Sequence, residues 1–212
     1  SRAALARAAA AGAMIVTAPP GTGKTTFVPP LVANLVRGDV LVTQPRRMAV
    51  RAAARRIAEL DGGAVGGTVG FTVRGERRAG PDTRIEVLTP GVLLRRLLAD
   101  PALDGAGAVI LDEVHERSVD GDLLLGILAE VRELREDLLV VAMSATLDAS
   151  GIAALLGGTV VEIPAALHPL AVDYAPFEGS RLDERGVTRD YLSHLASTAA
   201  AARRSADCDA LV

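Results

Sequence analysis

A glycine-rich turn near the start of the chain carries the only lysine of the molecule. The stretch reads TAPPGTGKTT over residues 17–26, and Lys24 stands against 22 arginines in a chain of 212 residues. Gly21 and Gly23 allow main-chain N–H groups to point into the turn, and the helix expected to begin at Lys24 adds partial positive charge. Such a turn predicts a cradle for phosphate groups. Because a slim ammonium can enter this cradle and a planar guanidinium is wider, we expect this one position to require lysine.

The same stretch predicts how a nucleoside triphosphate and its metal ion are held. Lys24 is expected to reach the β- and γ-phosphates of ATP, and the Thr25 hydroxyl is expected to bind Mg²⁺. The pattern usually opens with glycine, whereas this chain has Ala18 at that place. The predicted nucleotide-binding residues of the turn are Pro20, Gly21, Thr22, Gly23, Lys24, Thr25 and Thr26.

Two adjacent carboxylates follow another apolar run, 88 positions after the lysine. They are Asp112 and Glu113, in the sequence VILDEVHER over residues 109–117. A phosphate loop needs a carboxylate at the end of another strand to organise the metal ion, so Asp112 is predicted to bind Mg²⁺ together with Thr25. Glu113 is predicted to position the attacking water and to accept its proton. Lys24, Asp112 and Glu113 are therefore candidate catalytic residues.

Apolar runs alternate regularly with longer alanine- and leucine-rich segments, and this alternation predicts the elements that carry the candidate residues. It is typical of βα units, which build a parallel sheet with right-handed crossovers. We therefore expect an α/β fold with a parallel sheet flanked by helices on both faces. The expected strands cover 13–18, 39–45, 65–73, 84–90, 107–113, 138–146 and 159–164, and the expected helices cover 2–11, 24–36, 46–60, 91–100, 121–134 and 149–157.

Composition limits the kinds of partner. Half of the residues are hydrophobic but only 2% are aromatic, so the core must consist of Ala, Val, Leu and Ile. The net charge of −3 argues against a protein that binds polyanions over its whole surface, and any nucleic-acid contact must be local. The single cysteine, Cys208, excludes an internal disulfide. No apolar run reaches the ~18 residues of a membrane span, so we expect a cytoplasmic protein with no membrane partner.

The character of the sequence changes after Pro164. Residues 165–181 combine prolines with few helix signals, which is typical of a linker. Residues 182–205 predict one polar helix, and the closing DALV predicts the start of another strand. We therefore expect a complete domain over 1–164, followed over 165–212 by a linker, a helix and the truncated start of a second domain.

Several segments resemble the motifs of the superfamily 2 DEAH-box helicases. DEVHER (112–117), followed on the next expected strand by SAT (144–146), resembles motifs II and III. Two other stretches, TQPRRMAVRAAARRIA (43–58) and LTPGVLLRRL (88–97), resemble motifs Ia and Ib, and VGFTVRGE (69–76) matches the extended segment between them. The chain departs from the pattern at Val114, where the family usually has alanine.

Within this family, the join between the core and HPLAVDYAP (168–176) is most similar to that of the bacterial HrpB-type helicases. The resemblance implies a RecA-like fold of the P-loop NTPase class over 1–164. It also implies that 165–212 leads into a second RecA-like domain.

The resemblance also implies roles for single residues around the acidic pair. His115 would join the catalytic set and bridge the nucleotide site to motif III. Ser144 and Thr146 would couple hydrolysis to movement of the nucleic-acid strand. Glu116 and Arg117 are expected to brace the loop through local ion pairs.

Nucleic-acid contacts are expected from motifs Ia and Ib, and the residues implied are Arg46, Arg47, Arg74, Thr89, Pro90 and Gly91. Such contacts read phosphate and sugar, so we expect little sequence preference. The resemblance implies a single-stranded nucleic acid as partner, RNA ahead of DNA. Arg47, Arg51 and Arg55 share one face of the expected helix, and the pattern leaves open whether this arginine stripe is solvated or contacts phosphate. Arg56 lies apart from the stripe and matches the arginine that stacks on adenine in DEAH proteins.

The implied function is that of the nucleotide-binding core of an ATP-dependent helicase, which couples hydrolysis to strand translocation. Motifs IV to VI, with their arginine finger, do not occur in this sequence. The second RecA-like domain of the same protein is therefore an expected partner, and the 212-residue chain is expected to be nearly inactive alone. Two alternatives stay open. One is an AAA+ or other P-loop ATPase that remodels proteins, because PPGTGKT also resembles the AAA+ loop, and the other is a non-catalytic nucleotide- or RNA-binding module.

Overall fold

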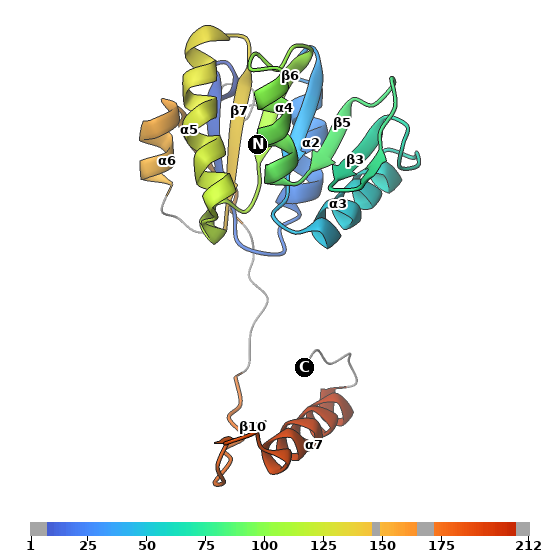
Figure 1. Cartoon of the computed structure of the whole chain (residues 1–212), viewed down its shortest axis with the longest axis vertical. Helices are drawn as coiled ribbons and strands as arrows, with labels where there is room; N and C mark the ends of the chain where they lie inside the picture. Colours follow the sequence, from blue (N-terminus) through green and yellow to red (C-terminus); the bar gives the residue numbers. More distant parts are fainter. Residues whose placement is uncertain (1–7, 146–148, 165–171, 207–212) are drawn as a thin grey trace. The chain divides into compact units, whose positions relative to one another are not determined.

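The computed structural model describes residues 8–145, 149–164 and 172–206. The chain divides into two compact units, Ser1–Leu167 and His168–Val212, which are drawn in Figure 1. The larger unit holds the sheet and all the candidate site residues, so the site can be described within it alone. The predicted helix over 2–11 falls mostly outside the described residues.

One sheet of eight strands forms the centre of the larger unit, in the order β4-β3-β5-β2-β6-β7-β1-β8. The prediction of a parallel sheet is confirmed for every pairing except that of β4 with β3, which is antiparallel. β4 was not predicted, because its three residues, Glu-Arg-Arg, include no apolar side chain. The strands are β1 (Ala13–Thr17), β2 (Asp39–Thr43), β3 (Val69–Val73), β4 (Glu76–Arg78), β5 (Ile85–Leu88), β6 (Ala106–Leu111), β7 (Leu139–Ser144) and β8 (Thr159–Glu162).

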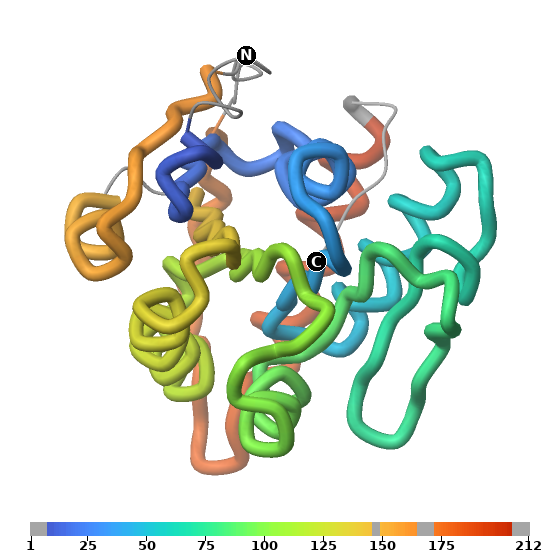
Figure 2. Tube along the Cα trace, turned by 90° about the horizontal axis from the view of Figure 1, so that it is seen from above, coloured from blue at the N-terminus to red at the C-terminus, as the bar shows by residue number. Residues whose placement is uncertain are grey.

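Helices cover both faces of this sheet, as expected. Figure 1 shows α4 and α5 in front of the strands and α2 behind them, and Figure 2 shows the same layers from above. Two separate apolar clusters fill the spaces, one between the sheet and α2 and α3, the other between the sheet and α4, α5 and α6. The helices are α2 (Lys24–Ala33), α3 (Arg47–Leu60), α4 (Pro90–Ala99), α5 (Val119–Leu134) and α6 (Ser150–Leu156).

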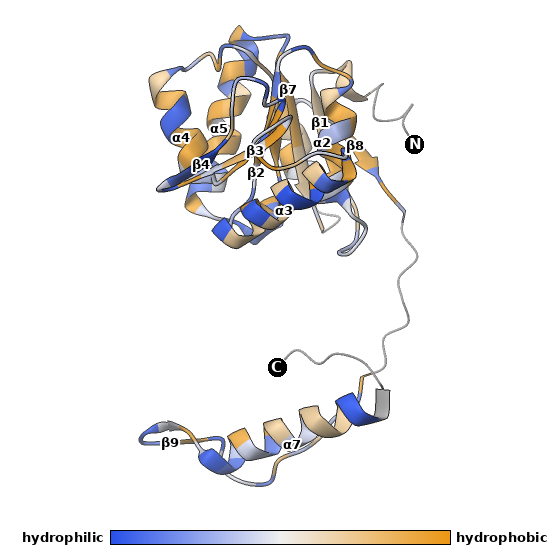
Figure 3. Ribbon diagram, turned by 90° about the vertical axis from the view of Figure 1, so that its right-hand side faces the viewer, coloured by the Kyte–Doolittle hydropathy of each residue, from blue (hydrophilic) through white to orange (hydrophobic). Residues whose placement is uncertain are grey.

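Successive residues of a strand supply the two clusters alternately. In β1, Met14 and Val16 belong to the α2 and α3 side, whereas Ala13 and Ile15 belong to the other. The inner strands β1, β2, β6 and β7 are buried on both faces, so they are continuous apolar runs rather than alternating ones, and they form the apolar interior seen in Figure 3. This pattern made the strands the most predictable elements.

Local capping chemistry sets where the helices near the site begin. The Ser118 side chain accepts a hydrogen bond from the Gly121 main chain at 3.1 Å, so α5 begins at Val119, two residues before the predicted start. α4 begins with Pro90, whose missing N–H costs nothing in the first turn. α2 follows Gly23, which has the left-handed φ of 77° that glycine adopts readily.

The smaller unit differs from its prediction at the start of its helix. Residues 182–187 form a short hairpin of β9 (Leu182–Asp183) and β10 (Gly186–Val187), and α7 (Arg189–Ala206) begins only after it. The Asp183 carboxylate accepts from the Arg185 N–H at 2.7 Å, and this turn chemistry prevails over helix propensity. A linker before α7 is consistent with residues 172–181, which contain no helix or strand.

Two glycines differ in the space that surrounds them, and substituting each by alanine tests the packing of the sheet. A Cβ at Gly107 in β6 would lie 1.8 Å from the Arg37 carbonyl oxygen, whereas a Cβ at Gly126 in α5 would meet nothing within 4 Å. Gly107→Ala should therefore lower the free energy of unfolding by about 1–3 kcal/mol through overpacking. The control, Gly126→Ala, should raise it by about 0.5–1 kcal/mol because alanine favours a helix interior. Urea unfolding of both variants measures the difference, and an equal effect would contradict the close approach of β6 to Arg37.

Candidate nucleotide site and adjacent groove

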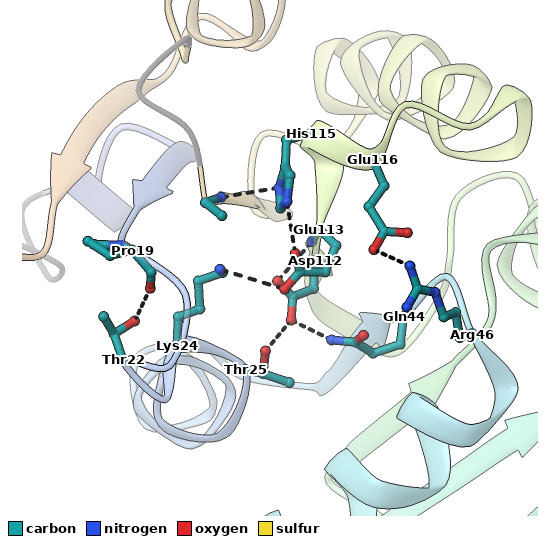
Figure 4. Close-up of polar contacts among 11 residues, drawn as sticks. Pro19, Thr22, Lys24, Thr25, Gln44, Arg46, Asp112, Glu113, His115 and Glu116 are labelled. Carbon is teal, nitrogen blue, oxygen red and sulfur yellow. Dashed lines mark hydrogen bonds and ion pairs between the residues drawn. The ribbon is translucent and has the colours of Figure 1, made fainter. Parts of the chain in front are cut away.

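The candidate residues lie where neighbouring parallel strands end. β2, β6, β7 and β1 are consecutive in the sheet, so the residues that follow them meet at its carboxyl edge. Open α/β sheets bind their ligands at this edge. Figure 4 shows the resulting cluster, with Lys24 and Thr25 on one side and Asp112, Glu113 and His115 on the other.

The phosphate loop is held in shape by its own side chains. Gly21 and Gly23 have φ values of 78° and 77°, a conformation that would strain any residue with a Cβ. The Thr22 hydroxyl donates to the Pro19 carbonyl at 3.0 Å, and the Thr26 hydroxyl donates to the Gly23 carbonyl at the same distance. The main-chain N–H groups of the loop and of the start of α2 remain the predicted phosphate cradle, although the N–H of Thr26 donates to the Gly23 carbonyl at 3.0 Å.

Asp112 is the most buried carboxylate of the cluster, with 5% of its surface exposed. The Thr25 hydroxyl donates to its Oδ2 at 2.5 Å, the Gln44 amide donates to the same oxygen, and the Glu113 N–H donates to its Oδ1 at 2.8 Å. Burial raises the pKa of Asp112 above its usual range, and the hydrogen bond from Thr25 acts in the opposite direction. The three donors therefore offset part of the cost of keeping this charge out of water.

Glu113 lies between two positively polarised groups. Its Oε1 is 3.6 Å from the Lys24 ammonium, whose side chain is only 6% exposed, and its Oε2 is 3.2 Å from Nε2 of His115. The Glu113 backbone has a φ of 55°, in the left-handed region that costs non-glycine residues free energy. Strain of this kind concentrates at functional sites, and the Glu113 carboxylate faces Lys24 of the phosphate loop.

His115 connects Glu113 to the end of β7. Its Nδ1 accepts a hydrogen bond from the Ala145 N–H at 3.2 Å, so a neutral ring carries its proton on Nε2, facing Glu113. Ala145 follows Ser144, which is buried and pairs with Thr17 in the sheet. His115 therefore contacts the residue after Ser144, whereas its bridging role stays a prediction, and Thr146 lies outside the described residues.

The residues around Thr25 fit a magnesium ion bound together with a nucleotide. No group of three or more His, Cys, Asp or Glu side chains that could cage a metal occurs among the described residues. The hydroxyl of Thr25 and the carboxylate of Asp112 are instead two hard oxygen donors beside the phosphate cradle. Mg²⁺ commonly takes one or two such ligands and completes its shell with water and phosphate oxygens.

The ion pairs of the acidic loop differ in part from expectation. Arg117 pairs with Asp122 at 3.0 Å, five residues on, which confirms a local brace. The same prediction for Glu116 is wrong, because its partner at 2.9 Å is Arg46, 70 positions away. Sequence spacing could not reveal this contact, since only the adjacency of β2 and β6 brings the two loops together. Arg46, a predicted nucleic-acid contact, is therefore already ion-paired.

Beside this cluster lies an open groove of about 760 Å³. It collects five of the six predicted nucleic-acid residues, namely Arg47, Arg74, Thr89, Pro90 and Gly91. Arg95 and Asp120 also line it, and neither was predicted. Arg95 could have been noticed, because it lies one helical turn after Gly91, whose carbonyl its Nε contacts at 3.3 Å.

Arg56 remains a prediction. It lies on the exposed side of α3, and its ion-pair partner in the described part of the chain is Glu59, at 3.4 Å. Gln44, by contrast, was missed entirely, although it is buried against Asp112. A lone amide after an apolar strand carries no signal that distinguishes it from an ordinary polar strand end.

A glycine-rich loop between a buried strand and a helix, with a strand-end carboxylate bonded to its threonine, defines a P-loop nucleotide-binding domain. The DEAD/DEAH box helicase family model matches residues 2–155, and the chain belongs to this family. It is 47% identical over 138 residues to the ATP-dependent RNA helicase HrpB of Escherichia coli (strain K12), covering 64% of this chain and 17% of that protein. It is 37% identical over 190 residues to the DExH-box ATP-dependent RNA helicase DExH3 of Arabidopsis thaliana, covering 84% of this chain and 16% of that protein.

Solved structures agree with this assignment. The crystal structure of the Escherichia coli DEAH/RHA helicase HrpB superposes with a TM-score of 0.83 and 37% identity, covering 96% of this chain and 26% of that one. The α/β, RecA-like fold is therefore confirmed. The chain spans less than a fifth of the length of the curated relatives given above. Across the described residues, no helix is long and apolar enough to cross a membrane.

The position of Gln44 gives a test of the metal site. Gln44→Ala removes a hydrogen bond that orients Asp112. Loss of a hydrogen bond to a metal ligand typically lowers metal affinity about 10–100-fold. We expect that loss in a Mg²⁺ titration followed by the binding of a fluorescent ATP analogue. The matched control is Arg46→Ala, two residues away, which breaks the ion pair to Glu116 and leaves Asp112 untouched. Equal Mg²⁺ dependence of the two variants would contradict a role for Asp112 in holding the ion.

Proposed function

We propose that the chain is the first RecA-like domain, over residues 1–164, of an ATP-dependent RNA helicase that couples hydrolysis to movement along a strand. The single observation that carries this proposal is the chain of contacts from Lys24 through Glu113 and His115 to Ala145. It runs from the phosphate loop to the end of β7 and lies beside a groove lined with arginine. Both curated relatives described above are named ATP-dependent RNA helicases, which supports RNA as the strand.

The proposed chemistry divides the reaction among the residues of the cluster. Lys24 and the N–H groups of the loop bind the β- and γ-phosphates, and Thr25 and Asp112 hold Mg²⁺. When bound, Mg²⁺ supplies charge neutralisation for the phosphate oxygens. Glu113 orients a water molecule toward the γ-phosphorus and accepts its proton as ADP leaves.

Nucleotide binding would also reorganise the cluster in a defined way. Lys24 faces Glu113 at 3.6 Å, and triphosphate oxygens would draw the ammonium toward themselves. One oxygen of Glu113 is then free to meet water, while His115 continues to hold the other. Through Ala145, His115 would also connect this change to Ser144, one of the two predicted coupling residues.

The groove and the nucleotide site imply two partners, a nucleic-acid strand and a second RecA-like domain. Contacts from the groove would reach phosphate and sugar, so binding should depend weakly on sequence and strongly on salt. A second RecA-like domain of the same protein would supply the arginine finger, a group worth about 10³–10⁵ in rate in other nucleotidases. Robust RNA-stimulated hydrolysis by the 212-residue chain alone would contradict this requirement.

Two alternatives to a helicase were open from the sequence. Membership of the DEAD/DEAH box family decides against an AAA+ remodelling ATPase. A non-catalytic nucleotide- or RNA-binding module remains a second candidate only for the isolated chain. The presence of Glu113, strained and aimed at the loop, favours the catalytic alternative.

Two substitutions separate binding from hydrolysis. Lys24→Arg should weaken ATP binding roughly 10–100-fold, because the wider guanidinium cannot place its charge and its hydrogen-bond donors where the ammonium meets the phosphates. Glu113→Gln should leave ATP binding intact and slow hydrolysis about 10²–10⁴-fold, because the general base is lost. Calorimetry on the chain measures the first effect. Single-turnover hydrolysis by the full-length protein in excess over ATP, with RNA and single-stranded DNA in parallel, measures the second. Wild-type binding by Lys24→Arg, or undiminished hydrolysis by Glu113→Gln, would overturn the assignment of these roles.

A further inference from the structure

The arginine stripe of α3 (Arg47, Arg51 and Arg55) has three different environments. Its members are four residues apart, so each lies about 6 Å along the helix from the next. Arg47 lines the groove, Arg51 is half-buried, and Arg55 is exposed with no ion-pair or hydrogen-bond partner among the residues the structure describes. The stripe is therefore not one uniform surface, and Arg51 needs its own explanation.

The partner of Arg51 lies on a hairpin that borders the groove. β3 ends at Val73 and β4 begins at Glu76, and these two residues face each other in the antiparallel register. The turn between them consists of Arg74, which is exposed and lines the groove, and Gly75. β4 is an edge strand bonded only to β3, so its three residues need support from outside the sheet.

Arg51 supplies that support. Its Nε and Nη2 both donate to Oε2 of Glu76, at 3.0 and 2.7 Å, and Arg78 approaches the other carboxylate oxygen at 3.4 Å. The hydrogen bond from Arg51 lowers the pKa of Glu76, so this carboxylate is charged at neutral pH. On the other side of the turn, the Arg47 guanidinium donates to the Arg74 carbonyl. Both residues that flank Gly75 are thus fastened to α3.

Arg51 itself is not part of the groove. It lines a separate hollow of about 450 Å³ together with Arg55, Arg78 and the last turn of α3. A residue that lay on the path of the nucleic acid would be expected in the same groove as Arg47 and Arg74. Its contacts are instead with the hairpin.

We propose that Arg51 is a positioning residue, which holds Glu76 and thereby fixes the β3–β4 turn so that Arg74 faces the nucleic-acid groove. The inference rests on the proposed function of that groove. It assigns no phosphate contact to Arg51. The fork of a guanidinium suits this task, because two of its N–H groups reach one carboxylate in a fixed geometry.

The first test compares two arginines of the same helix face in the 212-residue chain. Arg51→Met and Arg55→Met remove the same charge, but only Arg51→Met breaks the contact with Glu76. Because the pair is partly exposed, its loss should weaken binding of a labelled single-stranded RNA roughly two- to fivefold at low salt. Arg55→Met should bind as the unmodified chain does. Equal binding by both variants would overturn the proposal.

A double-mutant cycle shows whether Arg51 acts through Arg74. If it does, Arg51→Met should add little to Arg74→Met, and the double variant should keep the salt slope of Arg74→Met. If Arg51 contacted a phosphate directly, the two losses would add and the slope would fall by about a further 0.7, which would overturn the proposal. The exchange of Arg51→Glu with Glu76→Arg leaves the net charge unchanged and should restore binding toward that of the unmodified chain.

A readout independent of RNA completes the test. In hydrogen exchange, the amides of residues 73–78 should exchange faster in Arg51→Met than in Arg55→Met, and equal exchange would overturn the proposal. If the unmodified chain shows no salt-dependent binding of RNA, the proposed function fails together with this inference. If it binds RNA and the two methionine variants bind alike, this inference fails alone.

Discussion

The buried carboxylate of Asp112 is the constraint on which the site depends. A charge kept out of water is stable only where enough donors face it, and here they come from three different segments of the chain. Thr25 belongs to the first turn of α2, Gln44 follows β2, and the third donor is the main chain after β6. These donors meet only if β2 lies beside β6, with Thr43 level with Leu111, and if the loop after β1 ends at the same edge. The strand order of the sheet is therefore a requirement of this one group.

The fold was largely predictable because its inner strands are buried on both faces, which makes them continuous apolar runs whatever their neighbours are. β4 and the hairpin before α7 were not predictable in the same way, since short polar strands depend on turn chemistry and on contacts from distant residues. Within the site, Lys24, Thr25 and Asp112 belong to a spacing pattern that the sequence displays. Gln44 does not, because its partner is 68 positions away and its amide resembles any polar residue at a strand end.

Arginines in this chain also bind main-chain carbonyls, a role that helps to explain why arginine outnumbers lysine. Arg84, Arg132 and Arg135 each place their guanidinium where a helix or a loop leaves main-chain carbonyls without partners. A planar group with five N–H donors can serve several such carbonyls at once, which a single ammonium does less well. The carbonyls served belong to Ala33 and Val36, to Ala11 and Leu156, and to Ala102, Leu103 and Ala106 respectively. At Lys24 the geometry is reversed, because there one compact charge must enter a loop of N–H groups.

The short segment between β2 and α3 joins the nucleotide site to the groove. Gln44 contacts Asp112, Arg46 contacts Glu116, and Arg47 holds the turn that carries Arg74. The segment is stiff, since Pro45 fixes its own φ and restricts Gln44 to an extended conformation. One end of the segment is held in the sheet and the other begins α3. Its contacts therefore form a contiguous physical connection between the groove and the loop that carries Glu113, which is what the proposed coupling between strand and nucleotide would require.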